Sequence, residues 1–160
     1  MKHAALLTAL LLLPALPAAA EMPLGCFARD YSAEHLAKNP NQHIAALRLN
    51  FTRQPGAKEI SVDVIGRYGD QGRAKLDRVS GKVFTQLAFC DSKHCQVECD
   101  GGSFTVTSLK GDTLTIRTSY FVLEGGAGGC EGNSDLAELG GGETTYRLTR
   151  AVASACKGAD

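Results

Sequence analysis

Six cysteines are the side chains of this sequence best able to do chemistry: Cys26, Cys90, Cys95, Cys99, Cys130 and Cys156. Three of them and His94 fall within residues 90–99, where thiolates and an imidazole could hold a metal ion. Their C-x4-C-x3-C spacing lacks the C-x2-C pairs that zinc sites prefer. The sequence also lacks the Cys-x-x-Cys motif that would indicate a redox role. An even cysteine count is typical of disulfides in an exported chain, so we expect disulfides and assign no metal or cofactor.

The N-terminal residues predict export. The chain begins with Met1-Lys2-His3, continues with an apolar run over residues 4–16 and reaches the small residues Ala18-Ala19-Ala20. This order is that of a cleavable signal peptide, and the run is too short to be a membrane span. We predict a signal peptide at residues 1–20 and one disulfide-stapled domain at residues 21–160. The predicted location is the periplasm or the secreted fraction.

Distances along the predicted strands reduce the number of possible cysteine pairings. Six cysteines can pair in fifteen ways. Cys95 and Cys99 lie on one predicted strand about 13 Å apart at ~3.3 Å per residue, beyond the roughly 7 Å limit for a disulfide. Cys90 and Cys95 flank a four-residue hairpin loop, and Cys26 and Cys156 lie near the two termini. We predict Cys26–Cys156, Cys90–Cys95 and Cys99–Cys130, with the remaining pairings open.

A second group of reactive side chains, Arg29, Tyr31 and His35, follows the first cysteine. A short helix over a barrel mouth could hold them at a ligand site. The alternative is that they only cap the helix and cover the barrel end. His43 and His94 are interpreted as solvated loop or edge residues. No catalytic residue is assigned, because Gly-x-Ser-x-Gly and His-Glu-x-x-His are both absent.

Four arginines fall on the polar faces of predicted strands: Arg48, Arg67, Arg117 and Arg147. If those strands are neighbours, the arginines form a basic stripe that could bind an anion. The alternative is a solvated outer face with cross-strand partners such as Asp63.

Residues 125–142 hold eight glycines and no basic residue. So long a loop in a compact domain is either a functional segment, such as a lid, or a plain linker attached at Cys130. Glu131, Asn133 and Asp135 could bind calcium, but the residue order of an EF-hand loop is missing.

Apolar residues alternate with polar ones over most of the remaining chain, which predicts strands. The runs are residues 45–51, 60–64, 82–89, 104–107, 114–119 and 145–149, and in the third of them we place Val83, Thr85, Leu87 and Phe89 on the apolar face. Short turns between runs indicate antiparallel neighbours. We predict an all-β antiparallel meander barrel, with a β-sandwich as the alternative. One short helix is expected within residues 26–42, capped by Ser32 and stopped at Asn39-Pro40.

The charge balance excludes some partners. The chain has 17 basic and 17 acidic residues, and removing Lys2 with the signal leaves 16 against 17, a net charge near −1. This balance argues against nucleic acid and anionic membranes as partners. No apolar segment of spanning length follows the signal, so no membrane span is expected.

Two stretches resemble uncharacterised exported proteins of Gram-negative bacteria. They read GCFARDY at residues 25–31, running into HLA and NP at residues 35–40, and CDGGSF at residues 99–104. The resemblance implies a periplasmic location and no particular activity. The predicted barrel is also similar in outline to lipocalins, although the chain has no Trp for their Gly-x-Trp opening.

Three functions follow as hypotheses. The first is a non-enzymatic binding module for a small apolar or amphipathic ligand, since a barrel of about eight strands can enclose one. The second is a periplasmic protein-binding or protease-inhibitor-like domain that uses residues 21–24. The third is a hydrolase that uses His35 and Arg29. The partner, a small molecule or a periplasmic protein, is not identified.

Overall fold

Strands dominate the computed structural model, which describes residues 22–98, 100–123, 132 and 134–158. In chain order the strands are β1 (Gly25–Asp30), β2 (Ile44–Thr52), β3 (Ile60–Tyr68), β4 (Val83–Asp91), β5 (His94–Gln96), β6 (Gly102–Lys110), β7 (Thr113–Leu123), β8 (Ser134–Asp135) and β9 (Thr144–Ala151). The helices are short: α1 (Ala33–Lys38), α2 (Arg73–Leu76) and the 3-10 helix η1 (Ala153–Cys156).

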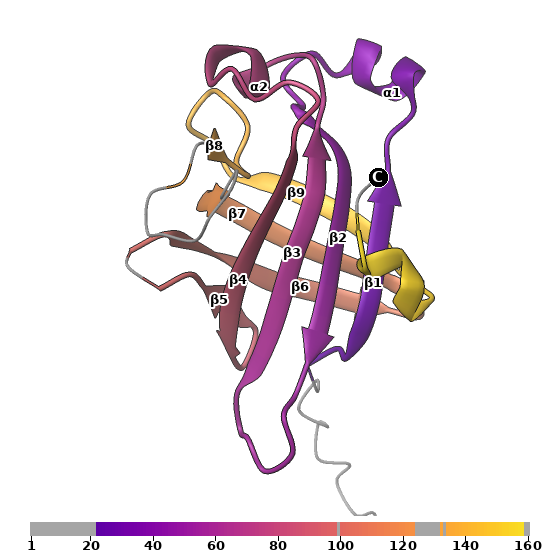
Figure 1. Cartoon of the computed structure of the whole chain (residues 1–160), viewed down its shortest axis with the longest axis vertical. Coiled ribbons are helices and arrows are strands. Elements are labelled where there is room, and N and C mark those ends of the chain that lie inside the picture. The colour runs from indigo at the N-terminus through magenta and orange to yellow at the C-terminus, as the bar shows by residue number, and fades with distance from the viewer. Residues whose placement is uncertain (1–21, 99, 124–131, 133, 159–160) are drawn as a thin grey trace, which may run out of the picture.

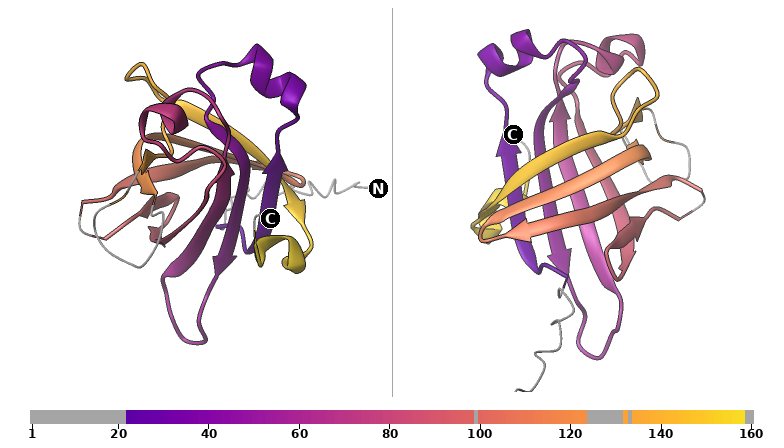
Figure 2. Two further views of the ribbon diagram at one scale, coloured as in Figure 1. Left: turned by 45° about the horizontal axis from the view of Figure 1, so that its top comes forward. Right: turned by 180° about the vertical axis from the view of Figure 1, so that it is seen from behind.

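Eight of the strands close into a barrel. Each pairs antiparallel with the next in the ring β1-β2-β3-β4-β5-β6-β7-β9, and β9 pairs back with β1. The short β8 pairs with the end of β7. In Figure 1, β2, β3 and β4 run steeply across the front while β6, β7 and β9 cross behind them, and Figure 2 shows the crossing from the back. The predicted meander barrel is confirmed, and the closed ring of pairing excludes the β-sandwich alternative.

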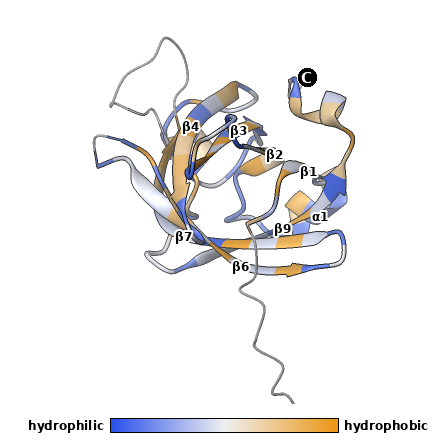
Figure 3. Cartoon of the chain, turned by 90° about the horizontal axis from the view of Figure 1, so that it is seen from below, coloured by the Kyte–Doolittle hydropathy of each residue, from blue (hydrophilic) through white to orange (hydrophobic). Residues whose placement is uncertain are grey.

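The inward side chains fill the barrel. Seven aromatic residues have less than 2% of their surface exposed: Phe27, Phe51, Tyr68, Phe84, Phe104, Phe121 and Tyr146. Leu47, Leu49, Leu114 and Ile116 pack among them at 0%. Figure 3, seen from below, shows hydrophobic colour along several of the strands around the ring. Fully burying each such side chain contributes about 1.5–3 kcal/mol. The described inward side chains therefore form a packed core inside the barrel.

The predicted apolar face of β4 is wrong. Phe84, Gln86, Ala88 and Cys90 face inward, while Val83 and Leu87 are each 45% exposed. The register explains the inversion, because Phe84 pairs with Gly66 of β3. A Cβ atom at Gly66 would meet the Phe84 ring, so that ring occupies the space that the glycine leaves inside the barrel.

The helix prediction needs one correction, because the short helices α2 and η1 were not predicted. Before the predicted helix, residues 25–30 form β1, where Phe27 packs edge-on against Phe51 with ring centroids 6.1 Å apart. The predicted helix itself is confirmed as α1, where the backbone N–H of His35 donates to the side chain of Ser32 at 3.1 Å. It ends at Lys38, with Asn39 as the C-cap residue before Pro40.

Two of the three predicted disulfides are present. Cys26 and Cys156 are bonded with Cα atoms 5.9 Å apart, and Cys90 and Cys95 with Cα atoms 3.9 Å apart. Cys99 and Cys130 lie outside the described residues, as does the predicted signal peptide. The two bonds indicate an oxidising, extracytoplasmic environment.

Candidate functional site

The strands β1 and β9 pair over only part of their length. Their ladder joins Cys26 to Ala151, Phe27 to Arg150 and Ala28 to Thr149, and ends there. Beyond this point β1 continues beside β2 as far as the pair Asp30 and Ala46. In the same direction β9 continues beside β7 as far as Thr144 and Thr118. The two strands therefore separate on the side of the barrel.

A cleft of about 640 Å³ lies where the strands separate. Its volume falls within the range of about 300–1,000 Å³ that is usual for ligand sites. All three residues singled out in the sequence line it: Arg29, Tyr31 and His35. The rest of the lining comes from the segment after α1, from β7 and β9, and from one acidic residue between β8 and β9: Asn39, Gln42, Thr113, Glu138, Thr145, Arg147, Leu148 and Thr149.

Tyr31 forms the centre of the wall on the β1 side. Its backbone N–H donates to the carbonyl of Ala45 at 3.0 Å, which holds it against β2. The guanidinium carbon of Arg29 lies 5.3 Å from the centre of the Tyr31 ring, a cation–π distance. The ring of His35 lies 4.9 Å away from the Tyr31 ring, tilted by 30°. The three side chains thus form one stacked group.

Hydrogen bonds fix the proton position on His35. The Gln42 amide nitrogen donates to the carbonyl of Ile44 at 3.1 Å, so its oxygen faces His35. That oxygen can only accept, and it lies 2.9 Å from Nε2 of His35. Nε2 therefore donates, which leaves Nδ1 of a neutral imidazole as an acceptor. Gln71 steadies α1 by donating to the carbonyls of Leu36, Asn39 and Gln42 at 2.6–3.0 Å.

The cleft is lined by more basic than acidic side chains. Among the described residues, Arg29 and Arg147 form no ion pair. Glu138 is the one carboxylate in the described lining, and burial raises its pKa above the ordinary value. Burial also raises the pKa of the Tyr31 hydroxyl to about 12, against the opposing effect of Arg29. Tyr31 is therefore a neutral hydrogen-bonding group at physiological pH.

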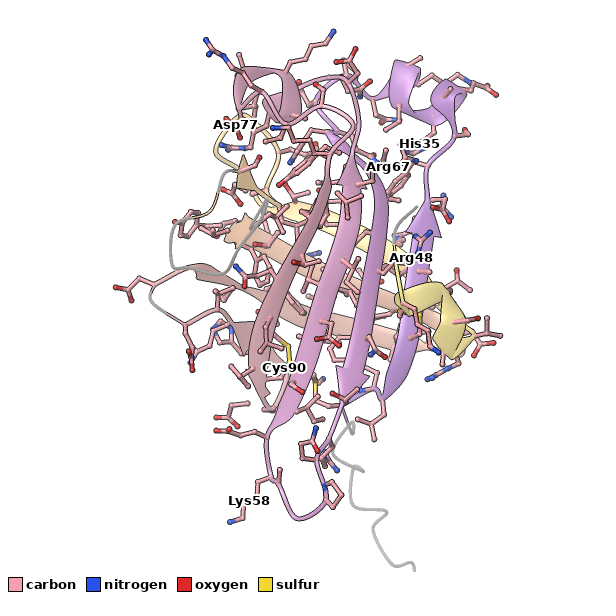
Figure 4. All side chains as sticks on the ribbon, viewed as in Figure 1. His35, Arg48, Lys58, Arg67, Asp77 and Cys90 are labelled. Carbon is pink, nitrogen blue, oxygen red and sulfur yellow. A yellow bond between two sulfur atoms is a disulfide. The ribbon has the colours of Figure 1, made fainter. Side chains whose placement is uncertain are left out.

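The predicted basic stripe does not form as one group. Arg48 pairs with Asp30 at 2.7 Å, and Arg117 pairs with Glu143 at 3.1 Å. Only Arg147 of the four lies in the cleft, while Arg67 stays on β3. In Figure 4, His35 lies at α1 near the upper end of the barrel and Arg48 lies lower on the front face.

Residues 134–138 cover the end of the barrel. The carboxylate of Asp135 accepts from the backbone N–H groups of Phe121 and Ala137, each at 2.9 Å. Its carbonyl accepts from Nε2 of His43 at 2.7 Å. The Tyr146 hydroxyl donates to the carbonyl of Leu136 at 2.8 Å. Asp135 thus acts as a turn-forming residue of this cover.

Two interpretations of single residues change accordingly. His43 has no exposed surface, so its description as a solvated residue is wrong, whereas His94 is exposed as predicted. The calcium hypothesis loses Asp135, whose carboxylate accepts from two backbone N–H groups and lies 3.9 Å from the guanidinium of Arg73, while Glu131 and Asn133 lie outside the described residues. In the part of the chain that the structure describes, no three His, Cys, Asp or Glu side chains are grouped as a metal site.

Sequence reasoning missed the β9 side of the cleft. Thr145, Arg147 and Thr149 are exposed alternate residues on one face of β9. Their alternation was visible in the sequence. What was not visible was that β9 would lie beside β1, since that contact is made by closure of the ring.

The fold and the cleft define a class: a disulfide-bonded, eight-stranded meander barrel with a polar cleft on its side. No protein family model matches the chain, nor does a curated protein or a solved structure. The assignment therefore stays at the level of the fold, and the resemblance to exported bacterial proteins stays a prediction. Within the described residues, no helix has the length and apolarity to cross a lipid bilayer.

Proposed function

We propose that this chain is an exported, non-enzymatic binding protein that takes a small amphipathic ligand in the cleft between β1 and β9. The observation that carries the proposal is the separation of these strands beneath α1, which opens a cleft of about 640 Å³ in an otherwise closed barrel. The described inward side chains form a packed core, so the ligand site is proposed on the side of the barrel. The disulfides support a periplasmic or secreted location.

The lining suits an amphipathic molecule. The Tyr31 ring offers apolar contact, while Thr113, Thr145 and Thr149 offer hydroxyl groups. Pockets of this kind combine apolar walls with a few placed polar groups. A hydrolase is less well supported, because His35 has the neutral Gln42 amide as its partner and not a carboxylate that would orient a general base.

Native mass spectrometry of protein purified from its own compartment tests this proposal. We expect a reproducible non-covalent adduct on the wild-type protein. Thr145→Trp, which fills the cleft from β9, should lose the adduct. The matched control Thr105→Trp, at an exposed position of β6 outside the cleft, should keep it. An adduct that persists on Thr145→Trp would contradict a site in the cleft.

A protein-binding role is the second candidate, and the open edge of β9 favours it. Toward β1, only the last three residues of β9 are paired. A partner's extended segment could add to the open part of the edge, as in other cases of strand addition. The segment before β1 is less suited to this role, because Pro23 is buried and Met22 packs against the core.

Protease inhibition assays separate this candidate from the first. If the β9 edge is the inhibitory surface, Thr145→Trp should abolish inhibition of a susceptible protease and Thr105→Trp should not. Deleting residues 21–24 should leave inhibition unchanged. Loss of inhibition on that deletion would instead assign the role to the N-terminal segment.

A further inference from the structure

The two arginines of the cleft differ from most others on the barrel. Arg48, Arg73, Arg117 and Arg150 each lie within 3.9 Å of a carboxylate. Arg29 and Arg147 have no such partner among the described residues. Both line the cleft, one from β1 and one from β9. Two guanidinium groups without a carboxylate partner in one concave site would attract an anion.

Neighbouring contacts restrict the position of Arg29. The Arg29 carbonyl accepts from Nη1 of Arg48 at 3.1 Å, and its guanidinium lies over the Tyr31 ring. Arg147 lies on the face of β9 that also presents Thr145 and Thr149. A guanidinium on each side, with hydroxyl donors beside one of them, is an arrangement that binds carboxylate or phosphate oxygens.

Glu138 does not cancel this charge. It is one carboxylate against two guanidinium groups, and its partly buried side chain holds a proton more readily than an exposed glutamate does. The net charge of the described lining stays positive. The Tyr31 ring leaves apolar surface for the remainder of a ligand.

We propose that the cleft recognises the anionic group of a small amphipathic molecule, a carboxylate or a phosphate ester, through Arg29 and Arg147. This inference rests on the proposed function, because it names the chemistry of the ligand that the same cleft takes. The Tyr31 ring contacts the apolar part of that ligand.

Three probes of equal chain length test the inference: octanoate, octyl phosphate and neutral octanol. Binding is followed by chemical shift changes of backbone amides in the full mature protein. We expect at least one anionic probe to bind about tenfold or more tightly than octanol, with shifts at β1, α1 and β9. The stronger of octanoate and octyl phosphate identifies the anionic group.

Charge-removing variants supply the second arm. Arg29→Gln and Arg147→Gln should each weaken binding of the anionic probe about tenfold and leave octanol binding unchanged, since a charge-assisted hydrogen bond is lost. Arg67→Gln is the matched control: it removes the same charge from β3, outside the cleft. Thermal unfolding of all three variants checks that they remain folded.

The outcomes separate the two proposals. If octanol shifts the cleft amides as strongly as the anionic probes, anion recognition is overturned and ligand binding in the cleft stands. If Arg67→Gln weakens binding as much as the cleft variants do, the effect is general charge attraction and the inference also fails. If no probe shifts the cleft amides, the inference is overturned, and the proposed function then depends on the native adduct alone.

Discussion

His43 is the residue whose environment differs most from what its position in the chain suggests. Its imidazole is fully buried between Tyr68, with ring centroids 6.3 Å apart, and the cover formed by residues 134–138. Nε2 faces a carbonyl that can only accept, so Nε2 carries the proton of the neutral ring. Nδ1 has no hydrogen-bond partner among the described residues. A second proton, on Nδ1, would place a positive charge in the core on a nitrogen that has no acceptor there.

Burial therefore lowers the pKa of His43, and nearby Arg73 lowers it further, against the opposing effects of the Asp135 carbonyl, Asp135 and Asp77. As the pH falls below about 6.5, the ordinary pKa of histidine, His43 takes up a proton in the unfolded chain before it does so in the folded protein. We expect the free energy of unfolding to decrease from pH 7.5 to pH 5.5, by at most about 1.4 kcal/mol per pH unit from this group.

Urea denaturation at a series of pH values measures that slope. His43→Gln, which keeps an N–H able to donate to Asp135, should flatten the profile over this range. His94→Gln on the exposed β4–β5 hairpin should leave the profile as in wild type. A wild-type slope that survives in His43→Gln would show that another group controls it.

At the scale of elements, the packing of β4 on β3 selects which face of β4 points inward. Phe84 fits beside Gly66, and a Cβ there would meet both the Phe84 ring and the Ala46 carbonyl oxygen. The ring in turn contacts Tyr68, with centroids 4.7 Å apart. The missing side chain of Gly66 thus lets β2, β3 and β4 pack closely at this point of the barrel wall.

Gly66→Ala should therefore destabilise the protein by about 2 kcal/mol, because the backbone of β2 cannot yield and Phe84 must leave its position. Gly142→Ala is the matched control, since its added methyl group meets open space and its backbone is not left-handed. It should change the free energy of unfolding by less than about 1 kcal/mol. Equal effects of the two substitutions in urea denaturation would contradict this account of β4.

At the scale of the whole molecule, closure of the ring depends on the short ladder between β1 and β9. A disulfide reinforces this seam, because Cys26 lies in the ladder and Cys156 lies in η1, just after β9. It joins residues 130 positions apart, whereas Cys90–Cys95 spans 5. The two bonds should therefore differ in how strongly they restrict the unfolded chain.

Removing Cys26–Cys156 by a double alanine substitution should cost about 4–5 kcal/mol, and removing Cys90–Cys95 about 2 kcal/mol, on the chain-entropy account. Urea denaturation of each double variant without reductant measures both costs. A larger loss for the Cys90–Cys95 variant would show that local packing, and not loop closure, sets their contribution.

The sequence by itself determined the class of fold, two disulfides and one side of the candidate site. Period-two alternation, short turns and cysteine spacing are local properties, so the sequence alone reveals them. Arg29, Tyr31 and His35 were found because they lie within one short segment, which a helix cap and a strand end hold together.

Only the tertiary structure decided the rest. The inward face of β4 depends on the space beside Gly66, and the burial of His43 depends on a hydrogen bond to a residue 92 positions away. Arg147 enters the site because β9 returns to β1 and then separates from it. These features come from contacts between segments distant in the chain, and a residue's own neighbours in sequence carry no information about which distant surface will cover it.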